Sequence, residues 1–142
     1  MISRAARTAA GLEAYMGVQP IEAKTHTRAV RLPVPALIGE LRQILGARLV
    51  AYIGSVGETR AVREWAEGTR APKGDTTERL RVAFQVAKGI ADTDGREIAQ
   101  AWFQGLNPLL GDVSPARLLR EGDLATDGRR VIAAGRDFLA EG

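Results

Sequence analysis

The sequence predicts an all-α protein, and three observations support this prediction. Apolar residues recur at helical spacing over most of the chain after residue 34, glycine and proline interrupt these runs at short intervals, and no convincing strand pattern follows residue 34. The 142 residues, 45% of them hydrophobic, suffice for one sizeable core or for two small helical subdomains that share one. We therefore expect an irregular helical domain in two consecutive parts, with a boundary near residues 91–95.

Residues 1–34 are predicted to form an N-terminal arm rather than a folded unit. Their periodicity is poor, and Pro33 and Pro35 disfavour helix at the residues before them. We expect this arm to be disordered or to pack on a partner. The alternative is that Arg28 and Arg31 enter a DNA minor groove.

Residues 35–68 are predicted to contain two or three short helices. The first apolar stripe runs from Leu37 to Ile53 and is interrupted only by Gly46, which predicts two helices or one broken helix. A turn at residues 54–57 follows, and the next helix begins at about residues 58–59 and ends at Gly68. We expect Trp65 to lie in the core.

Two Asp-x-x-Glu pairs are predicted to begin the next two helices. The first pair, Asp75 and Glu78, precedes one long apolar run, and the second pair, Asp94 and Glu97, precedes a shorter helix that stops near residues 105–108. The shorter helix is expected to bury Ile98, Ala101 and Trp102.

The last two helices are predicted from their end signals. Ser114 supplies a capping hydroxyl before Pro115, and Gly122 ends that helix, whose Leu118 and Leu119 are expected to face the core. The final helix is expected to run from about residue 127 to the terminus.

The residue types argue against catalysis and against a cofactor. The chain has no cysteine and one histidine, His26, and its carboxylates have no metal-ligand spacing and no Ser-His-Asp order. It also has no phosphate-binding glycine motif. We expect no enzyme activity, no cofactor and no small-molecule substrate, and the absence of a long apolar run predicts a cytoplasmic protein without a membrane segment.

Charge is distributed unevenly along the chain. Residues 1–34 and 35–91 each carry a net charge of +3, whereas residues 92–142 carry −3. The basic N-terminal part favours contact with nucleic acid, and the acidic C-terminal part suits a basic protein partner. Ordinary solubility charge is an equally good explanation of the same imbalance.

Two motifs follow one another and together resemble a known family. Residues 58–72, ETRAVREWAEGTRAP, resemble the recognition helix and turn of an Xre-type helix-turn-helix. Residues 101–123, AWFQGLNPLLGDVSPARLLREGD, follow with an Asn-Pro break and a Leu-Leu helix that begins with proline. This succession is similar to the Xre/MbcA/ParS-type antitoxins over about residues 35–142.

The resemblance implies an architecture and a function. Residues 35–91 would form the Xre-like helix-turn-helix, and residues 92–142 a small helical domain that binds a toxin and dimerises. The partner would be a RES-domain toxin, an enzyme that consumes NAD, neutralised by a homodimeric antitoxin that also represses its own operon.

Four basic residues are candidates for binding operator DNA. Arg60 and Arg63 on the recognition helix can give bidentate contacts to guanine, and Arg70 and Lys73 can hold phosphates. The alternative is a solvated helix face, because three neighbouring glutamates would repel phosphate: Glu58, Glu64 and Glu67. The turn before the helix is also longer than the usual one by about two residues.

Six residues are candidates for binding the toxin. Most positions that match the antitoxin motif suit any helical core, so residues expected in solvent are the better candidates: Arg117, Arg120, Asp137, Glu141 and Gly142. The sixth candidate, Asn107, is itself a motif position. Asn107 is favoured as a structural break. The acidic end of the chain would occupy the pocket that holds the phosphates of a dinucleotide.

Two other functions stay open from the sequence. A stand-alone helix-turn-helix regulator with a C-terminal dimerisation domain predicts tight, salt-sensitive operator binding. A structural interaction module with a vestigial helix-turn-helix predicts weak, unspecific DNA binding and fits the longer turn.

Overall fold

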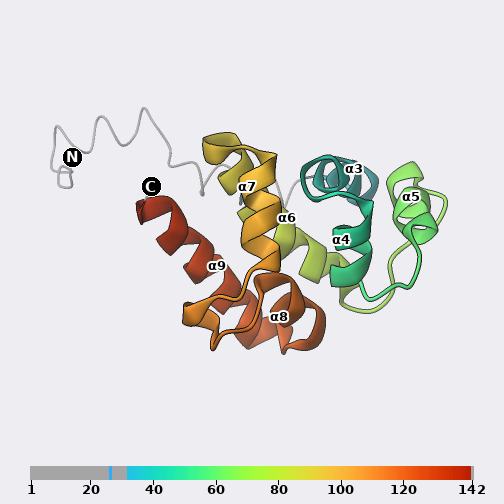
Figure 1. Ribbon diagram of the computed structural model, residues 1–142. Coiled ribbons are helices and arrows are strands. Elements are labelled where there is room, and N and C mark those ends of the chain that lie inside the picture. Colours follow the sequence, from blue (N-terminus) through green and yellow to red (C-terminus); the bar gives the residue numbers. More distant parts are fainter. Residues whose placement is uncertain (1–25, 27–31, 142) are drawn as a thin grey trace, which may run out of the picture.

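The computed structural model describes residue 26 and residues 32–141, and this part of the chain is all-α (Figure 1). The elements are α3 (Val34–Leu45), α4 (Ala47–Ile53), α5 (Thr59–Glu67), α6 (Thr76–Asp94), α7 (Arg96–Gln104), the short 3-10 helix η1 (Pro108–Leu110), α8 (Pro115–Glu121) and α9 (Leu124–Glu141). The predicted fold class is confirmed. Arg28, Arg31 and nearly all of the predicted arm lie outside the described residues. No helix in the described part is both long and apolar enough to cross a membrane.

The predicted break between the first two helices is confirmed at Gly46. Gly46 has φ 87°, a backbone conformation that L side chains rarely adopt, and its N–H bonds to the carbonyl of Arg42 at 2.8 Å. The turn at Gly46 changes the direction of the chain, so that α3 and α4 contact each other and both contact α5. Gly68 likewise ends α5 in the left-handed conformation, as predicted.

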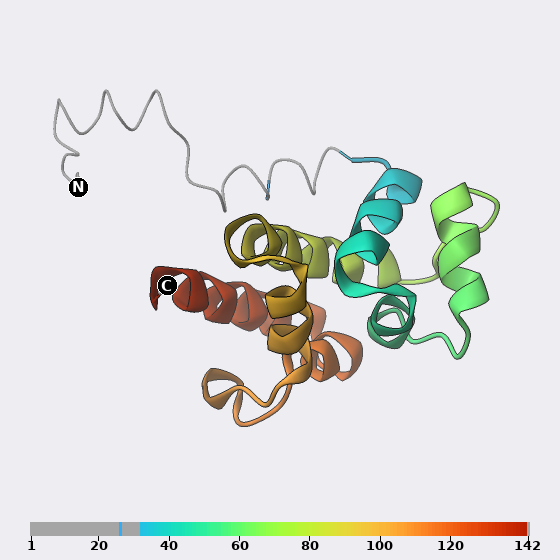
Figure 2. The same cartoon turned by 45° about the horizontal axis from the view of Figure 1, so that its top comes forward.

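Helix α6 is shared by the two halves of the molecule. It contacts α3 and α4 on one side and α7, α8 and α9 on the other, and Figure 2 shows it between the α5 end and the free end of α9. Its Leu80, Phe84 and Ile90 are fully buried in a single hydrophobic core that receives side chains from both halves. The boundary predicted at residues 91–95 falls where α6 ends, and the division of the chain into two domains stays a prediction.

Helices α6 and α9 cross closely because glycine lies at the crossing. A Cβ on Gly135 would lie 2.6 Å from Cγ1 of Val86 on α6. Gly89 makes a looser contact, since its Cβ would lie 3.5 Å from Leu139. The closeness of this crossing therefore depends on Gly135.

The two predicted Asp-x-x-Glu capping boxes are wrong. Asp75 is the N-cap residue of α6, but its side chain makes no capping bond and pairs with Arg79 instead. Asp94 is the last residue of α6, and Gly95 is the N-cap of α7. The left-handed φ of 95° at Gly95 breaks the chain one residue later than the prediction placed the helix start.

The buried face of α7 also differs from the prediction. Ala99 and Phe103 are fully buried, Trp102 is half-buried against Phe103 and Phe138, and Ile98 is 42% exposed. The expected burial of Ile98 and Ala101 is therefore wrong, because packing against α6 and α3 selects a neighbouring stripe of this short helix.

The predicted start of α8 is confirmed. Oγ of Ser114 accepts a hydrogen bond from the N–H of Arg117 at 3.1 Å, and Gly122 follows the last turn. Leu119 is buried and Leu118 is partly buried. Helix α9 begins at Leu124 rather than at residue 127, because Oδ2 of Asp123 accepts the Thr126 N–H at 3.1 Å.

Candidate interaction surfaces

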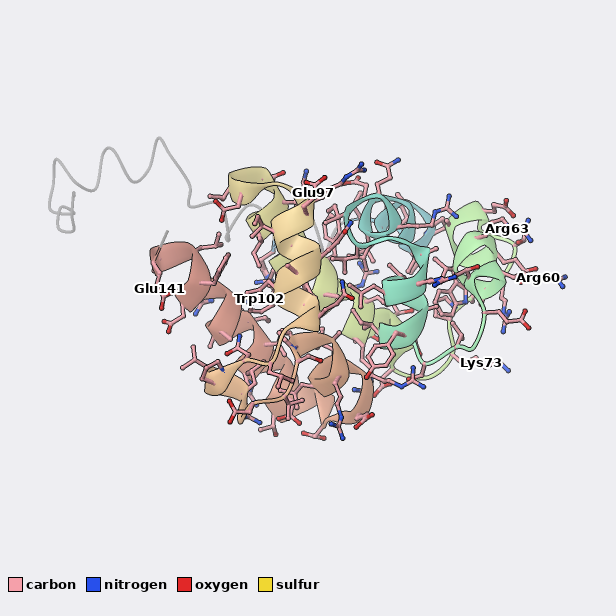
Figure 3. All side chains as sticks on the ribbon, viewed as in Figure 1. Arg60, Arg63, Lys73, Glu97, Trp102 and Glu141 are labelled. Carbon is pink, nitrogen blue, oxygen red and sulfur yellow. The ribbon has the colours of Figure 1, made fainter. Side chains whose placement is uncertain are left out.

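Helix α5 is held at the edge of the molecule by a tight turn and one buried face. Trp65, 2% exposed, packs over Gly54, where an added Cβ would lie 2.9 Å from Cη2 of the indole. Ala61 and Val62 complete the buried face. The opposite face, including Arg60 and Arg63, points to solvent, as in a helix that is presented to a partner (Figure 3).

The four candidate DNA residues lie around α5, but they are not equivalent. The carboxylate of Glu64 accepts from Nε of Arg60 at 3.0 Å and pairs with Nη1 of Arg70 at 3.3 Å. Arg63 and Lys73 are exposed and form no ion pair with another described residue. Two cations of the candidate set are thus partly neutralised and two are available.

Glu64 is held in its charged form. The hydrogen bond from Arg60 is the largest cause that lowers the pKa of Glu64, with smaller contributions from Arg70. An ionised glutamate on the outer side of α5 reduces the positive potential of this face. Glu64 is therefore the acidic residue that directly neutralises two candidate cations, and Glu58 and Glu67 are exposed at the two ends of the same helix.

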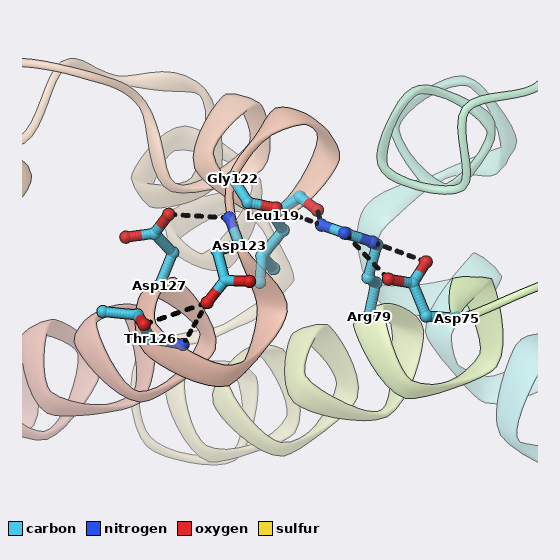
Figure 4. A network of polar contacts seen from close by, with 7 residues as sticks. All are labelled: Asp75, Arg79, Leu119, Gly122, Asp123, Thr126 and Asp127. Carbon is cyan, nitrogen blue, oxygen red and sulfur yellow. Dashed lines mark hydrogen bonds and ion pairs between the residues drawn. The ribbon is translucent and has the colours of Figure 1, made fainter.

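Arg79 joins the start of α6 to the end of α8 (Figure 4). Its Nη1 donates to the carbonyls of Leu119 at 2.6 Å and Gly122 at 2.9 Å, while Nε and Nη2 hold both carboxylate oxygens of Asp75 at 2.9 Å. The hydrogen bonds from Arg79 are the main cause that lowers the pKa of Asp75. A cation at the C-terminal carbonyls of α8 is also favoured by the helix dipole.

Arg120 joins α8 to α4. Its Nη1 donates to the carbonyl of Tyr52 at 2.7 Å, and its guanidinium lies 4.7 Å from the centre of the Tyr52 ring. The prediction that Arg120 simply projects to solvent is wrong, because the packing of α8 on α4 could not be read from local periodicity. Arg117 is exposed and pairs with Glu121 at 3.0 Å.

Asn107 organises the loop between α7 and α8. Its Oδ1 accepts the Leu109 N–H at 2.9 Å, its carbonyl accepts the N–H groups of Leu110 and Asp112 at 2.9 Å, and its N–H donates to Val113 at 3.2 Å. These bonds account for Asn107 as the structural break that the sequence favoured.

The same loop exposes two leucines that the sequence reasoning missed. Leu106 is 76% exposed and Leu109 is 57% exposed. The available signal was three leucines in a short segment between Gly105 and Gly111, of which Leu110 is buried. A well-bonded loop that presents apolar side chains is typical of an interaction site.

The six candidate toxin residues occupy three separate places. Asn107 lies in the loop, Arg117 and Arg120 lie on α8, and Asp137 and Glu141 are exposed on the last turns of α9. Gly142 lies outside the described residues. Figure 3 places Glu141 at the opposite end of the molecule from Arg60 and Arg63.

A groove opens between α4, the end of α7 and the start of α8. Its volume is about 600 Å³, and we call it the α4 groove. The lining residues are Leu45, Gly46, Ala47, Arg48, Leu49, Tyr52, Gln104, Ser114 and Ala116. No group of three or more His, Asp or Glu residues in the described part of the chain is placed to hold a metal ion.

Comparison with solved structures identifies a protein of similar fold. A chain of the M. tuberculosis MbcT-MbcA toxin-antitoxin complex superposes with a TM-score of 0.57 at 24% sequence identity, covering 75% of this chain and 96% of that chain. The two proteins share a fold. This match agrees with the fold that the resemblance predicted, and the antitoxin role stays a prediction. The sequence matches no protein-family model and no curated protein.

Proposed function

We propose that this chain is the non-enzymatic antitoxin of a toxin–antitoxin pair and neutralises its toxin by direct binding. The observation that carries the proposal is the similarity to a chain of a toxin–antitoxin complex along nearly the whole of that chain. The exposed carboxylates at the end of α9 support it, because such a surface suits a basic polypeptide.

The proposed partner is a RES-domain toxin that consumes NAD in the cytoplasm. Such an enzyme needs positive groups to hold the phosphates of the dinucleotide. Exposed carboxylates of another protein can bind these positive groups in place of the phosphates. Asp137 and Glu141 are exposed one turn apart at the free end of α9, and their side chains make no ion pair with another described residue. The end of α9 is therefore the segment proposed to cover the active site.

Co-expression with the protein encoded beside this chain tests the proposal. The full chain should restore growth and keep the cellular NAD concentration near that of cells without the toxin. A chain that ends at Arg136, or one with Asp137→Lys and Glu141→Lys, should bind the toxin at least about tenfold more weakly. The matched control is Asp94→Lys, another exposed acid, at the end of α6.

The outcomes separate the role from the site. Failure of the full chain to protect cells from any neighbouring gene product would refute the antitoxin role. Full protection by the chain that ends at Arg136 would leave that role intact and refute the proposed contact of the acidic end.

Binding of operator DNA by a homodimer is the second proposed activity, and the free arginine on α5 favours it. Arg63 is exposed on the outer face of α5 without an ion pair in the described part of the chain. Arg63→Ala should weaken operator binding by roughly 1–3 kcal/mol. Glu64→Gln should strengthen operator binding, and the slope of log K against log salt concentration should become steeper by about one unit. Weak binding that ignores both changes and DNA sequence would favour an interaction module instead.

A further inference from the structure

The α4 groove has a mainly apolar lining and one basic residue, Arg48. Leucine and alanine side chains of α3, α4 and α8 line it together with Tyr52, and none of its lining residues is acidic. Arg48 is exposed at the rim and makes no ion pair with another described residue. Its volume of about 600 Å³ is enough for a few side chains of a partner. The groove therefore suits an apolar segment that carries a carboxylate.

The neighbouring loop, residues 105–113, has the complementary properties. It exposes Leu106 and Leu109, and its single charged residue, Asp112, is exposed and unpaired among the described residues. The backbone bonds of Asn107 hold the loop in one shape before any partner arrives, which lowers the entropy cost of docking.

Loop and groove are adjacent on one molecule. The antiparallel bridge between Asn107 and Val113 brings Leu106 alongside Ser114, and Ser114 lines the groove. Because the loop and the groove are adjacent, a single two-fold axis can place the loop of each copy against the groove of the other copy.

We propose that the occupant of the α4 groove is the 105–113 loop of a second copy of this chain. In the resulting two-fold dimer, Leu106 and Leu109 of each copy cover the apolar floor of the other, and Asp112 of each copy faces Arg48 of the other. Both apolar surfaces are then removed from water at once, and both unpaired charges gain a partner. This interface does not depend on the antitoxin role and leaves α5 and the end of α9 uncovered.

The test measures the molar mass of the full chain by sedimentation over a range of concentrations. The unchanged protein should dimerise, and the double change Leu106→Ser with Leu109→Ser should raise the dissociation constant by roughly a hundredfold or more. The matched control is Ile98→Ser, which removes an exposed apolar side chain outside the loop and the groove and should leave the constant unchanged.

Charge reversal tests the pairing directly. Arg48→Glu and Asp112→Lys should each weaken the dimer, and a chain that carries both should dimerise more tightly than either, since the reversed charges again face each other. Asp112 has φ 62°, which strains lysine, so Asp112→Asn serves as the milder variant because asparagine tolerates this conformation. Circular dichroism confirms that each variant is folded.

Cross-linking gives an independent measurement because the chain has no cysteine. A mixture of Arg48→Cys and Asp112→Cys chains, distinguished by a mass tag, should oxidise mainly to the mixed dimer. A wild-type chain that stays monomeric, a dimer unaffected by the leucine changes, or a double charge reversal no tighter than the single ones would each overturn the proposal.

Discussion

Replacement of Arg79 by methionine should destabilise the protein strongly, although Arg79 lies in neither proposed partner surface. Methionine retains the apolar stem and removes the guanidinium, so the carbonyls of Leu119 and Gly122 lose their bonds of 2.6 and 2.9 Å. A hydrogen bond to a charged group contributes about 1.5–3 kcal/mol, which gives roughly 3–6 kcal/mol for two. The ion pair with Asp75, whose side chain is 55% exposed, adds at most about 1 kcal/mol.

Urea and thermal unfolding would measure this loss. For a domain of this size, 3 kcal/mol corresponds to a fall in Tm of about 10 °C or more. Asp75→Asn removes only the exposed pair and should cost less than about 1 kcal/mol. Arg129→Met is the control, because Arg129 bonds within its own helix to Ala125 and should change stability by less than about 0.5 kcal/mol. If Arg79→Met costs no more than this control, the assigned role of Arg79 in joining α6 to α8 is wrong.

Three further changes test the packing, a capping residue and an ionised carboxylate. Gly135→Ala should destabilise the protein by about 1–3 kcal/mol, because the new Cβ would lie 2.6 Å from Val86. Gly128→Ala is the control and should be neutral or stabilising, since its Cβ would make ordinary contacts of 3.4 and 3.6 Å. Equal effects of the two changes on urea unfolding would contradict the close crossing of α6 and α9. Ser114→Ala should lower the free energy of unfolding by about 1 kcal/mol in the same assay. An unchanged midpoint of urea unfolding would show that the capping bond does not stabilise the protein. The folded pKa of Glu64 lies below its ordinary value of 4.5, so its stabilising contribution is present above that value and is lost as the pH falls through the folded pKa. Glu64→Gln should therefore make Tm less sensitive to acid, and identical acid profiles would refute this.

Helix ends that depend on local chemistry could be predicted from the sequence. Gly46, Gly68 and the pair Ser114–Pro115 act through backbone conformation or through a bond to a residue close in the chain, and all lie where expected. Such signals do not depend on the rest of the fold.

Features that depend on distant contacts could not be predicted. Ile98 was assigned to the core because several stripes of a short helix are apolar, and only the packing of α7 on its neighbours decides among them. Arg120 was expected in solvent because nothing near it in the chain reveals that Tyr52 lies beneath it. The exposed Leu106 and Leu109 were missed for the opposite reason, since apolar residues are assigned to the interior unless the structure shows otherwise.

The bonds that shape the 105–113 loop come from Asn107 and from main-chain atoms, so the side chains of Leu106 and Leu109 contribute little to its conformation. Mutations at these two positions can therefore accumulate without loss of the fold. The loop can thus be altered at its two exposed leucines to change what it binds while the fold is kept.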